Sequence, residues 1–321
     1  MMKKFDFEKL EFVDSFVAFL DILGFSKLVY SDDESELQKI NFYFWIVEKY
    51  LKNLQEELDE INKESIDLDS EKDTLLKMDY IIISDSIIIA VKQIEYDFSD
   101  MNKERFNSLD KYFSDTNKCK KVKPIKEKQK ELYLLIKKQI KLYNTFNKLG
   151  FEKLCGAIEN IQKTLASQNI WLRGAISTGT MHISTSKKQI IGKAYIDAYK
   201  LESEKAIYPR VILNEEIIQK LYYKSEEEFI KSTAYMFHWD NTSIEKDTPL
   251  FIDYFRFSTA VPDNDSDVNS IVNNILMSYE SSKGEDHHHK YQWLLEYMKV
   301  CLERGDKSYN SLLSKLTRIN D

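Results

Sequence analysis

The chain has 321 residues, 43% of them hydrophobic, and its 46 basic and 53 acidic side chains give a net charge of −7. This composition supports a sizeable core, and the acidic balance argues against a protein that coats nucleic acid while leaving a local basic pocket open. The three cysteines are scattered, the start has no signal-peptide pattern and the longest apolar run is too short to span a bilayer, so we expect a reduced, cytoplasmic protein with no membrane partner.

The first strand is predicted in Phe16–Ser26, where apolar residues run into Asp21 and then into a tight turn that contains Gly24. A long amphipathic helix is predicted next, because apolar residues recur every three or four positions from Leu37 to Ile61.

A β-hairpin is predicted over Tyr80–Val91, with Asp85 at its tip between Ser84 and Ser86. Asp21 and Asp85 both interrupt apolar strands, where an unpaired carboxylate is costly unless a cation or several hydrogen bonds compensate its charge. A shared divalent cation is the simplest ligand for the pair. The alternatives are a helix-capping or turn role for Asp21 and a hairpin-turn role for Asp85.

The middle of the chain changes in composition. A polar, lysine-rich stretch from about Glu95 to Lys130 is typical of a solvated insertion. Helical patterning resumes over Leu132–Ala166, with a break expected near Gly150. The later predicted elements are a strand, turn and second strand over Trp171–Ser184, a loop entering a helix over Ile190–Glu204, strands over Pro209–Leu213 and Phe251–Phe257, and helices over Ile271–Tyr279 and Tyr291–Leu302.

This order of elements predicts an α+β sandwich in which helices cover a mainly antiparallel sheet. We expect a main domain over residues 1–260, a polar and helical insertion within it at about 95–150, and a C-terminal helical extension over 261–321.

Four motifs resemble those of class III nucleotide cyclases and occur in that family's order. They are DILGFS at Asp21–Ser26, SDS at Ser84–Ser86, LRGAISTG at Leu172–Gly179 and GKAYIDAYKLES at Gly192–Ser203. The FLDILGF opening and the start of the last motif are most similar to the pyrimidine cyclases of the bacterial Pycsar antiphage system. The resemblance implies a ferredoxin-like βαββαβ core in the main domain, a homodimer with its sites at the interface, and two Mn²⁺ or Mg²⁺ ions.

The resemblance also implies metal ligands and phosphate contacts. Asp21, Asp85 and the Ile22 carbonyl would hold the two cations, which lower the pKa of the ribose 3′-hydroxyl and bridge the triphosphate. Three backbone N–H groups at the following helix start would contact the β- and γ-phosphates, those of Gly24, Phe25 and Ser26.

The positions that contact the base differ from those of purine cyclases. That subgroup uses a Lys and an Asp or Thr, and the aligned positions here are Ile81 and Gln189. Neither side chain repeats the adenine contact, which favours a pyrimidine base. A smaller base leaves room for an aromatic side chain, for which the Phe42–Trp45 cluster and Tyr50 are candidates.

The cation that stabilises the transition state is the least defined part of the predicted site. Purine cyclases supply an Asn and an Arg from the interface helix, where this chain has Ile196 and Lys200. Lysine offers a point charge without the bidentate geometry of Arg, so Lys200 is a stand-in rather than an equivalent. Arg173 and Lys193 are the other basic candidates, with a structural ion pair for Arg173 and a solvent-exposed position for Lys193 as the alternatives.

We therefore expect a phosphorus–oxygen lyase, a uridylate or cytidylate cyclase that converts UTP or CTP to the 3′,5′-cyclic nucleotide and pyrophosphate for antiphage signalling. One alternative is a cyclase-fold protein that binds nucleotide without turnover, because Ile196 and Lys200 depart from the family. The other is a purine cyclase with a different base contact.

Overall fold

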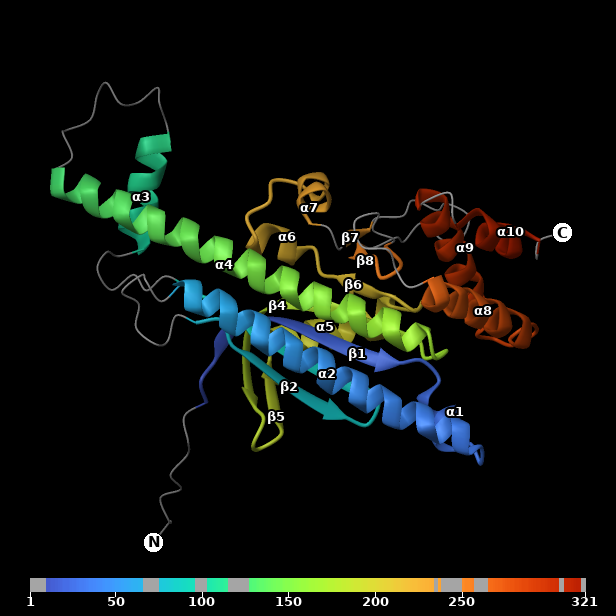
Figure 1. Cartoon of the computed structure of the whole chain (residues 1–321). Helices are drawn as coiled ribbons and strands as arrows, with labels where there is room; N and C mark the ends of the chain where they lie inside the picture. The colour runs from blue at the N-terminus through green and yellow to red at the C-terminus, as the bar shows by residue number, and fades with distance from the viewer. Residues whose placement is uncertain are drawn as a thin grey trace, which may run out of the picture.

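The computed structural model describes residues 10–65, 75–95, 103–114, 127–233, 236–237, 250–256, 265–305 and 309–318. Within these ranges the chain has the predicted α+β class (Figure 1). The strands are β1 (Val13–Ile22), β2 (Met78–Ile83), β3 (Ser86–Lys92), β4 (Leu172–Ser184), β5 (Gln189–Gly192), β6 (Val211–Leu213), β7 (Met236–Phe237) and β8 (Phe251–Ile252). The helices are α1 (Phe25–Val29), α2 (Glu34–Ser65), α3 (Lys103–Ser114), α4 (Glu127–Ala166), α5 (Lys193–Lys205), α6 (Glu216–Lys220), α7 (Glu226–Ser232), α8 (Asp265–Ser281), α9 (His288–Arg304) and α10 (Asn310–Thr317).

The described strands form one sheet in the order β2-β3-β1-β4-β6-β8-β7, with β5 paired to β4. All of these neighbouring strands are antiparallel except β4 and β6, which run parallel. Strand β1 lies between β3 and β4 and pairs with β4 along its whole length. The segment β1–α2–β2–β3–α4–β4 therefore supplies four adjacent strands and two helical connections.

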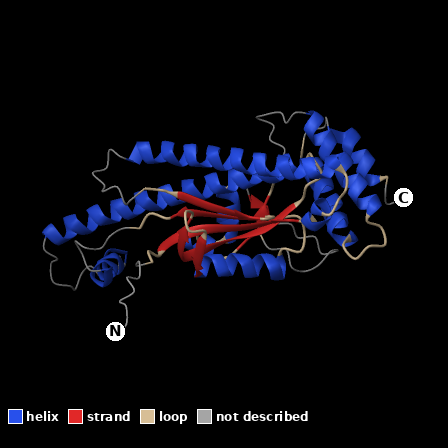
Figure 2. Cartoon of the chain, turned by 90° about the horizontal axis from the view of Figure 1, so that it is seen from below, coloured by secondary structure: helices blue, strands red, loops and turns tan. Residues whose placement is uncertain are grey.

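Side chains of β1 alternate between the two faces of the sheet, as a strand requires. Phe16 and Leu20 pack into the large core beneath α2 and α4, whereas Val17 and Phe19 pack with Ala194 and other residues of α5 on the opposite face. Figure 2 shows this division, with the long helices on one side of the sheet and a shorter helix on the other. Asp21 follows the same alternation as Phe19, so the candidate site lies on the α5 face.

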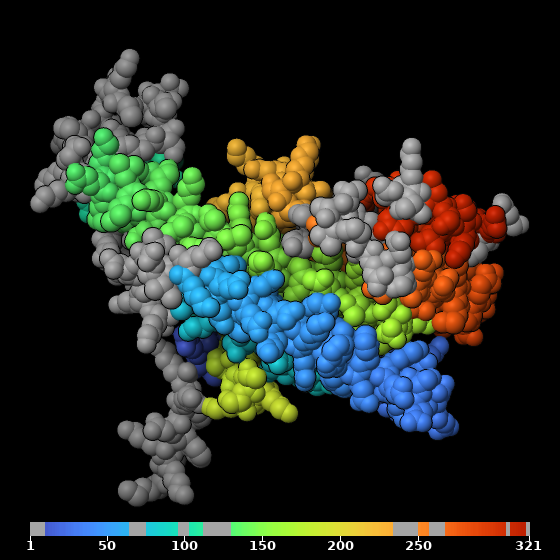
Figure 3. Space-filling model, viewed as in Figure 1, coloured from blue at the N-terminus to red at the C-terminus, as the bar shows by residue number. Residues whose placement is uncertain are grey.

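The long helix predicted from the apolar repeat is confirmed as α2. Its buried positions include Tyr43, Val47, Leu51, Leu54 and Leu58, spaced three or four residues apart. Figure 3 shows α2 and α4 side by side across this face of the molecule. The hairpin predicted over Tyr80–Val91 is also confirmed, as β2 and β3.

The break expected near Gly150 is wrong, because α4 is one continuous 40-residue helix. Gly150 lies against the side chain of Leu76, and a β-carbon there would lie 3.1 Å from it. This glycine therefore permits close packing rather than ending the helix. The expected end of the insertion near residue 150 falls within α4, whose residues from Leu142 onward already pack on the main core.

The turn expected within Trp171–Ser184 is also wrong. Strand β4 runs without interruption through Gly179, which lies opposite Ser15 of β1. The chain reverses later, before β5, which pairs back onto the outer end of β4. Local glycine and threonine content indicated a turn, but pairing with the central strand holds this segment extended.

The C-terminal helices pack against the sheet rather than apart from it. Residues of α8, α9 and α10 form a cluster with Ile212 and Phe251 of the sheet, centred on Trp293. The helices predicted over Ile271–Tyr279 and Tyr291–Leu302 are confirmed within α8 and α9. None of the described helices is long and apolar enough to cross a bilayer.

Only part of two other predictions falls on described residues. The late strand predicted over Phe251–Phe257 is wrong beyond Ile252, because residues 253–256 leave the sheet in a turn; its last residue lies outside the described ranges. Of the lysine-rich stretch, residues 96–102 and 115–126 lie outside them as well. Its described part includes α3, which packs with the first turns of α4 through Phe106, Tyr133 and Ile136.

Candidate active site

The structure brings Asp21 and Asp85 to the same end of the sheet. In the pairing of β1 with β3, Asp21 lies opposite Ser86, the residue that directly follows Asp85. Ser84 has a left-handed backbone with φ 57°, which suits the two-residue connection between β2 and β3. The hairpin tip therefore carries Asp85 to the carboxyl of Asp21.

The environment of Asp21 disfavours its negative charge. Its side chain is 19% exposed, and burial raises the pKa of its carboxyl above the ordinary value. The guanidinium of Arg173 lowers that pKa, whereas the carboxyl of Asp85 raises it again. Two carboxylates that repel each other in a partly buried position are stabilised by a bound cation.

The oxygen donors at this position fit a hard divalent cation. Two carboxylates and the backbone carbonyl of Ile22 are ligands of the type that Mg²⁺ and Mn²⁺ prefer. Among the described residues, no group of three His, Cys, Asp or Glu side chains forms a complete cage. An Mg²⁺ ion held by Asp21 and Asp85 would therefore need water and substrate phosphates to complete its ligands.

Tyr43 of α2 approaches the two carboxylates from the core. Its hydroxyl donates a 3.3 Å hydrogen bond to the backbone carbonyl of Asp85. Burial raises the pKa of Tyr43, and the charges of Asp85 and Asp21 raise it further, so the hydroxyl stays protonated. Sequence reasoning missed this residue, although a tyrosine on a buried helical stripe calls for a polar partner.

Arg173 lies between Asp21 and a second acidic residue, Glu202 of α5. It lies opposite Asp21 in the β1–β4 pairing, and its Nη2 is 3.2 Å from Asp21 Oδ2. Its Nε is 2.7 Å from Oε1 of Glu202, which is 3% exposed and whose pKa is raised by burial. The structural ion pair considered for Arg173 is thus present. Glu202 was not predicted, because nothing local in the sequence links it to β4.

The turn after β1 is held from both sides. The Leu23 N–H donates to the Trp171 carbonyl at 2.8 Å, and Gly24 takes the left-handed conformation, with φ 76°, that a side chain would strain. Phe25 packs on the main core, whereas Ser26 is exposed. The predicted phosphate-binding segment therefore lies at the surface directly beyond Asp21.

The candidates on α5 are not brought to Asp21 within one chain. Lys193 begins the helix and pairs with Asp197 at 3.0 Å and Glu216 at 3.1 Å, roughly 13 Å along the axis from Glu202. Ile196 and Lys200 are exposed, on the side of α5 that faces away from the sheet.

The two positions aligned with the base contacts of purine cyclases both lie in the sheet. Gln189 pairs with Ser184, about 36 Å along β4 from Arg173. Ile81 is 5% exposed and lies opposite Ile88 in the hairpin, so its side chain is part of the sheet packing.

The aromatic candidates of α2 lie on that helix rather than at the carboxylates. Tyr50 shares a 3.1 Å hydrogen bond with Thr164 of α4. Trp45 is 57% exposed, and its ring contacts that of Phe42.

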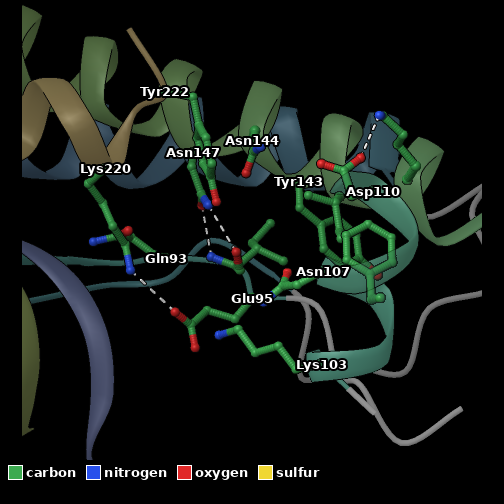
Figure 4. Close-up of a pocket in the computed structure, with 14 residues that line it drawn as sticks. Gln93, Glu95, Lys103, Asn107, Asp110, Tyr143, Asn144, Asn147, Lys220 and Tyr222 are labelled. Atoms are coloured by element: carbon green, nitrogen blue, oxygen red, sulfur yellow. Dashed lines mark hydrogen bonds and ion pairs between the residues drawn. The ribbon is translucent and has the colours of Figure 1, made fainter. Parts of the chain in front are cut away.

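A cavity of about 380 Å³ lies at the opposite end of β1, between α3, α4 and α6 (Figure 4). Lys220 pairs there with Asp14 and Glu95, and Lys137 pairs with Asp110. The cations at this cavity thus have carboxylate partners, as Arg173 has at the Asp21 end of the sheet.

Comparisons with known proteins do not place this chain in a family. The chain matches no model of a protein family, and no curated protein matches it at a significant level of similarity.

Proposed function

We propose that this chain is a metal-dependent nucleotide cyclase that converts UTP or CTP to the 3′,5′-cyclic nucleotide and pyrophosphate, and that the product is a signal in antiphage defence. The observation that carries the proposal is the pair of carboxylates, Asp21 and Asp85, which two separate strand ends bring together in a partly buried position.

The connectivity supports a cyclase-like core. The strands of the β1–α2–β2–β3–α4–β4 segment take the order β2-β3-β1-β4, which is the order of a ferredoxin-like βαββαβ fold. The motifs at Asp21–Ser26 and Ser84–Ser86 lie at adjacent ends of this core.

The chemistry asks mainly for positioning and charge from the protein. Divalent cations, when bound, lower the pKa of the ribose 3′-hydroxyl and neutralise the triphosphate. Asp21, Asp85 and the Ile22 carbonyl would hold them, and Tyr43 fixes the backbone of Asp85 through its hydrogen bond. Arg173 stands beside Asp21, where its guanidinium can stabilise negative charge on the α-phosphate.

A homodimer is the second part of the proposal. The outward face of α5 leaves Ile196 48% and Tyr199 49% exposed, and Ile191 of the preceding strand is 48% exposed. A two-fold axis at this face would bury these apolar side chains against their own copies. It would also bring Lys200 and Gln189 of the partner chain toward Asp21, a position they do not reach within one chain.

The choice of a pyrimidine rests on Ile81 and Gln189, which offer no cation for a purine edge. The decisive experiment incubates the purified protein with each of the four nucleoside triphosphates and Mn²⁺, and separates the products by chromatography. A cyclic product from UTP or CTP is expected. Asp21→Asn should abolish it, and Asp59→Asn, which alters an exposed carboxylate on α2, should not.

Product from ATP or GTP alone would contradict the pyrimidine assignment, and unchanged activity in the Asp21 variant would contradict the metal site. Complementation tests the dimer. Asp21→Asn and Lys200→Gln variants, each inactive alone, should recover activity on mixing. In a mixed dimer one of the two sites combines the native Asp21 of one chain with the native Lys200 of the other.

A nucleotide-binding protein without turnover is the alternative that a specific observation favours. Arg173 is held by two carboxylates, and the interface helix has Ile196 and Lys200 where purine cyclases have Asn and Arg. Binding of UTP or CTP with no product under Mg²⁺ or Mn²⁺ would support this alternative.

A further inference from the structure

The C-terminal helix α9 is packed against the candidate site. Leu23, Leu201 and Tyr291 all pack on the apolar cluster around Trp293. Leu23 lies two residues after Asp21, Leu201 directly precedes Glu202, and Tyr291 directly follows Lys290. Residues next to Asp21, on α5 and in the first turn of α9 therefore pack on one cluster.

This packing adds Lys290 to the charges around Asp21. Lys290 lies within electrostatic reach of Asp21, Arg173 and Glu202, and it is partly buried. It forms no ion pair with any residue that the structure describes, although Asp21 and Glu202 are close. Because Lys290 pairs with neither carboxylate, its ammonium remains available to another ligand.

Charges of both signs act on Lys290 at this end of the molecule. Burial lowers the pKa of Lys290 and the guanidinium of Arg173 lowers it further, whereas the carboxylates of Asp21 and Glu202 raise it. Burial also lowers the pKa of His287, and Lys27 of α1 and Lys290 add to that effect. Arg173 of β4 and Lys290 therefore lie close enough to influence each other, at the N-terminal end of α9, which adds positive potential. Once a divalent cation offsets the carboxylates of Asp21 and Asp85, the charges of Arg173 and Lys290 favour a bound anion.

We propose that Lys290, together with Arg173, binds the phosphate chain of the substrate, so that the C-terminal helices are part of the site. The inference rests on the proposed function, and it deepens it by naming a cation from the same chain for the triphosphate. Lysine suits this role because its ammonium is a compact charge that follows a flexible phosphate chain.

The probe is inorganic tripolyphosphate, titrated into the full chain by calorimetry at fixed ionic strength, with the same excess of Mg²⁺ in both solutions. Lys290→Gln should weaken its binding by about tenfold, the factor that corresponds to about 1.4 kcal/mol. Lys290→Arg should keep most of the affinity because the charge is retained. Lys283→Gln is the matched control, because Lys283 is an exposed lysine near the start of α9 that pairs with Glu280.

A measurement on the unmodified protein covers the case in which the Gln variant fails to fold. Tripolyphosphate should protect Lys290, but not Lys283, from an amine-labelling reagent followed by mass spectrometry. Absence of tripolyphosphate binding, equal binding by Lys290→Gln and the native chain, or equal labelling of Lys290 with and without the anion would overturn the inference.

The binding and activity measurements together distinguish failure of this inference from failure of the proposed function. If Lys290 is needed for tripolyphosphate binding but no nucleotide is cyclised, the anion site holds and the cyclase assignment fails. If a cyclic product forms with the same KM in native protein and Lys290→Gln, the cyclase assignment holds and the role of Lys290 fails.

Discussion

Replacing Arg173 by Met should destabilise the fold in a manner that depends on pH. The native guanidinium lies 2.7 Å from Glu202 and 3.2 Å from Asp21, and the carboxyl of Glu202 is almost fully buried. Removing one partner of a buried ion pair costs about 3–5 kcal/mol. Because Lys290 still offsets part of the charge, we expect a loss of about 3 kcal/mol at pH 8, the lower end of that range.

The pH dependence follows from the direction of the pKa shifts. Burial already raises the pKa of Asp21 and Glu202 in the folded state, and Arg173 opposes that rise. Without Arg173 the folded-state values rise further above the unfolded ones, so the folded variant binds protons that the unfolded chain does not. Its stability therefore falls as pH rises from the ordinary carboxyl range through the raised pKa, and the penalty should be smaller at pH 5.5 than at pH 8.

Urea unfolding followed by circular dichroism at both pH values measures this effect. Arg105→Met, on the exposed side of α3, is the control and should change stability little at either pH. Adding Glu202→Gln to Arg173→Met should restore much of the loss, because it removes the buried charge left without a partner. Equal penalties at the two pH values, or a double variant as unstable as the single one, would refute the reasoning.

Three further predictions concern stability. A β-carbon at Gly192 (φ 154°) would lie 2.4 Å from Met181 Cα, so Gly192→Ala should lower the free energy of unfolding by about 3 kcal/mol. At Gly284 nothing lies within 4 Å of such a β-carbon, and Gly284→Ala should lower it by only about 1 kcal/mol. Thermal unfolding of the two variants compares these losses. The side chain of buried Asn62 makes two hydrogen bonds with the backbone of Leu76, in the loop before β2. Asn62→Ala should therefore lower the free energy of unfolding by about 2 kcal/mol and speed amide hydrogen exchange at Leu76. Mn²⁺ at a hundred times its dissociation constant should add about 2.7 kcal/mol to the native chain but not to Asp21→Asn, as a thermal-shift titration would show.

The local patterns of the sequence predict those elements whose periodicity is long or whose turn is tight. The repeat of α2 is an example, because its apolar positions follow the helical period for most of its length. The hairpin around Asp85 is another, because polar residues interrupt two runs of isoleucine. The meeting of Asp21 with Asp85 follows once both strands are assigned and paired.

Features set by contacts between distant residues could not be predicted in this way. Gly150 reads as a helix breaker until Leu76 is seen packed on it, and Gly179 reads as a turn until β1 is seen to pair across it. Glu202 and Lys290 are ordinary charged residues of helices in the sequence. Only the packing of α5 and α9 on the sheet places them beside the ion pair of Arg173, so no local signal marks them.

The charges at the Asp21 end imply that cation and anion binding are coupled. Three carboxylates, those of Asp21, Asp85 and Glu202, are set against the two cations Arg173 and Lys290, so the cluster carries a net negative charge that repels a phosphate chain. A divalent cation bound by Asp21 and Asp85 reverses the sign and leaves Arg173 with Glu202 as its remaining partner. The guanidinium and the ammonium of Lys290 then attract the same anion. Each ligand therefore strengthens binding of the other, and by thermodynamic linkage the two enhancements are equal.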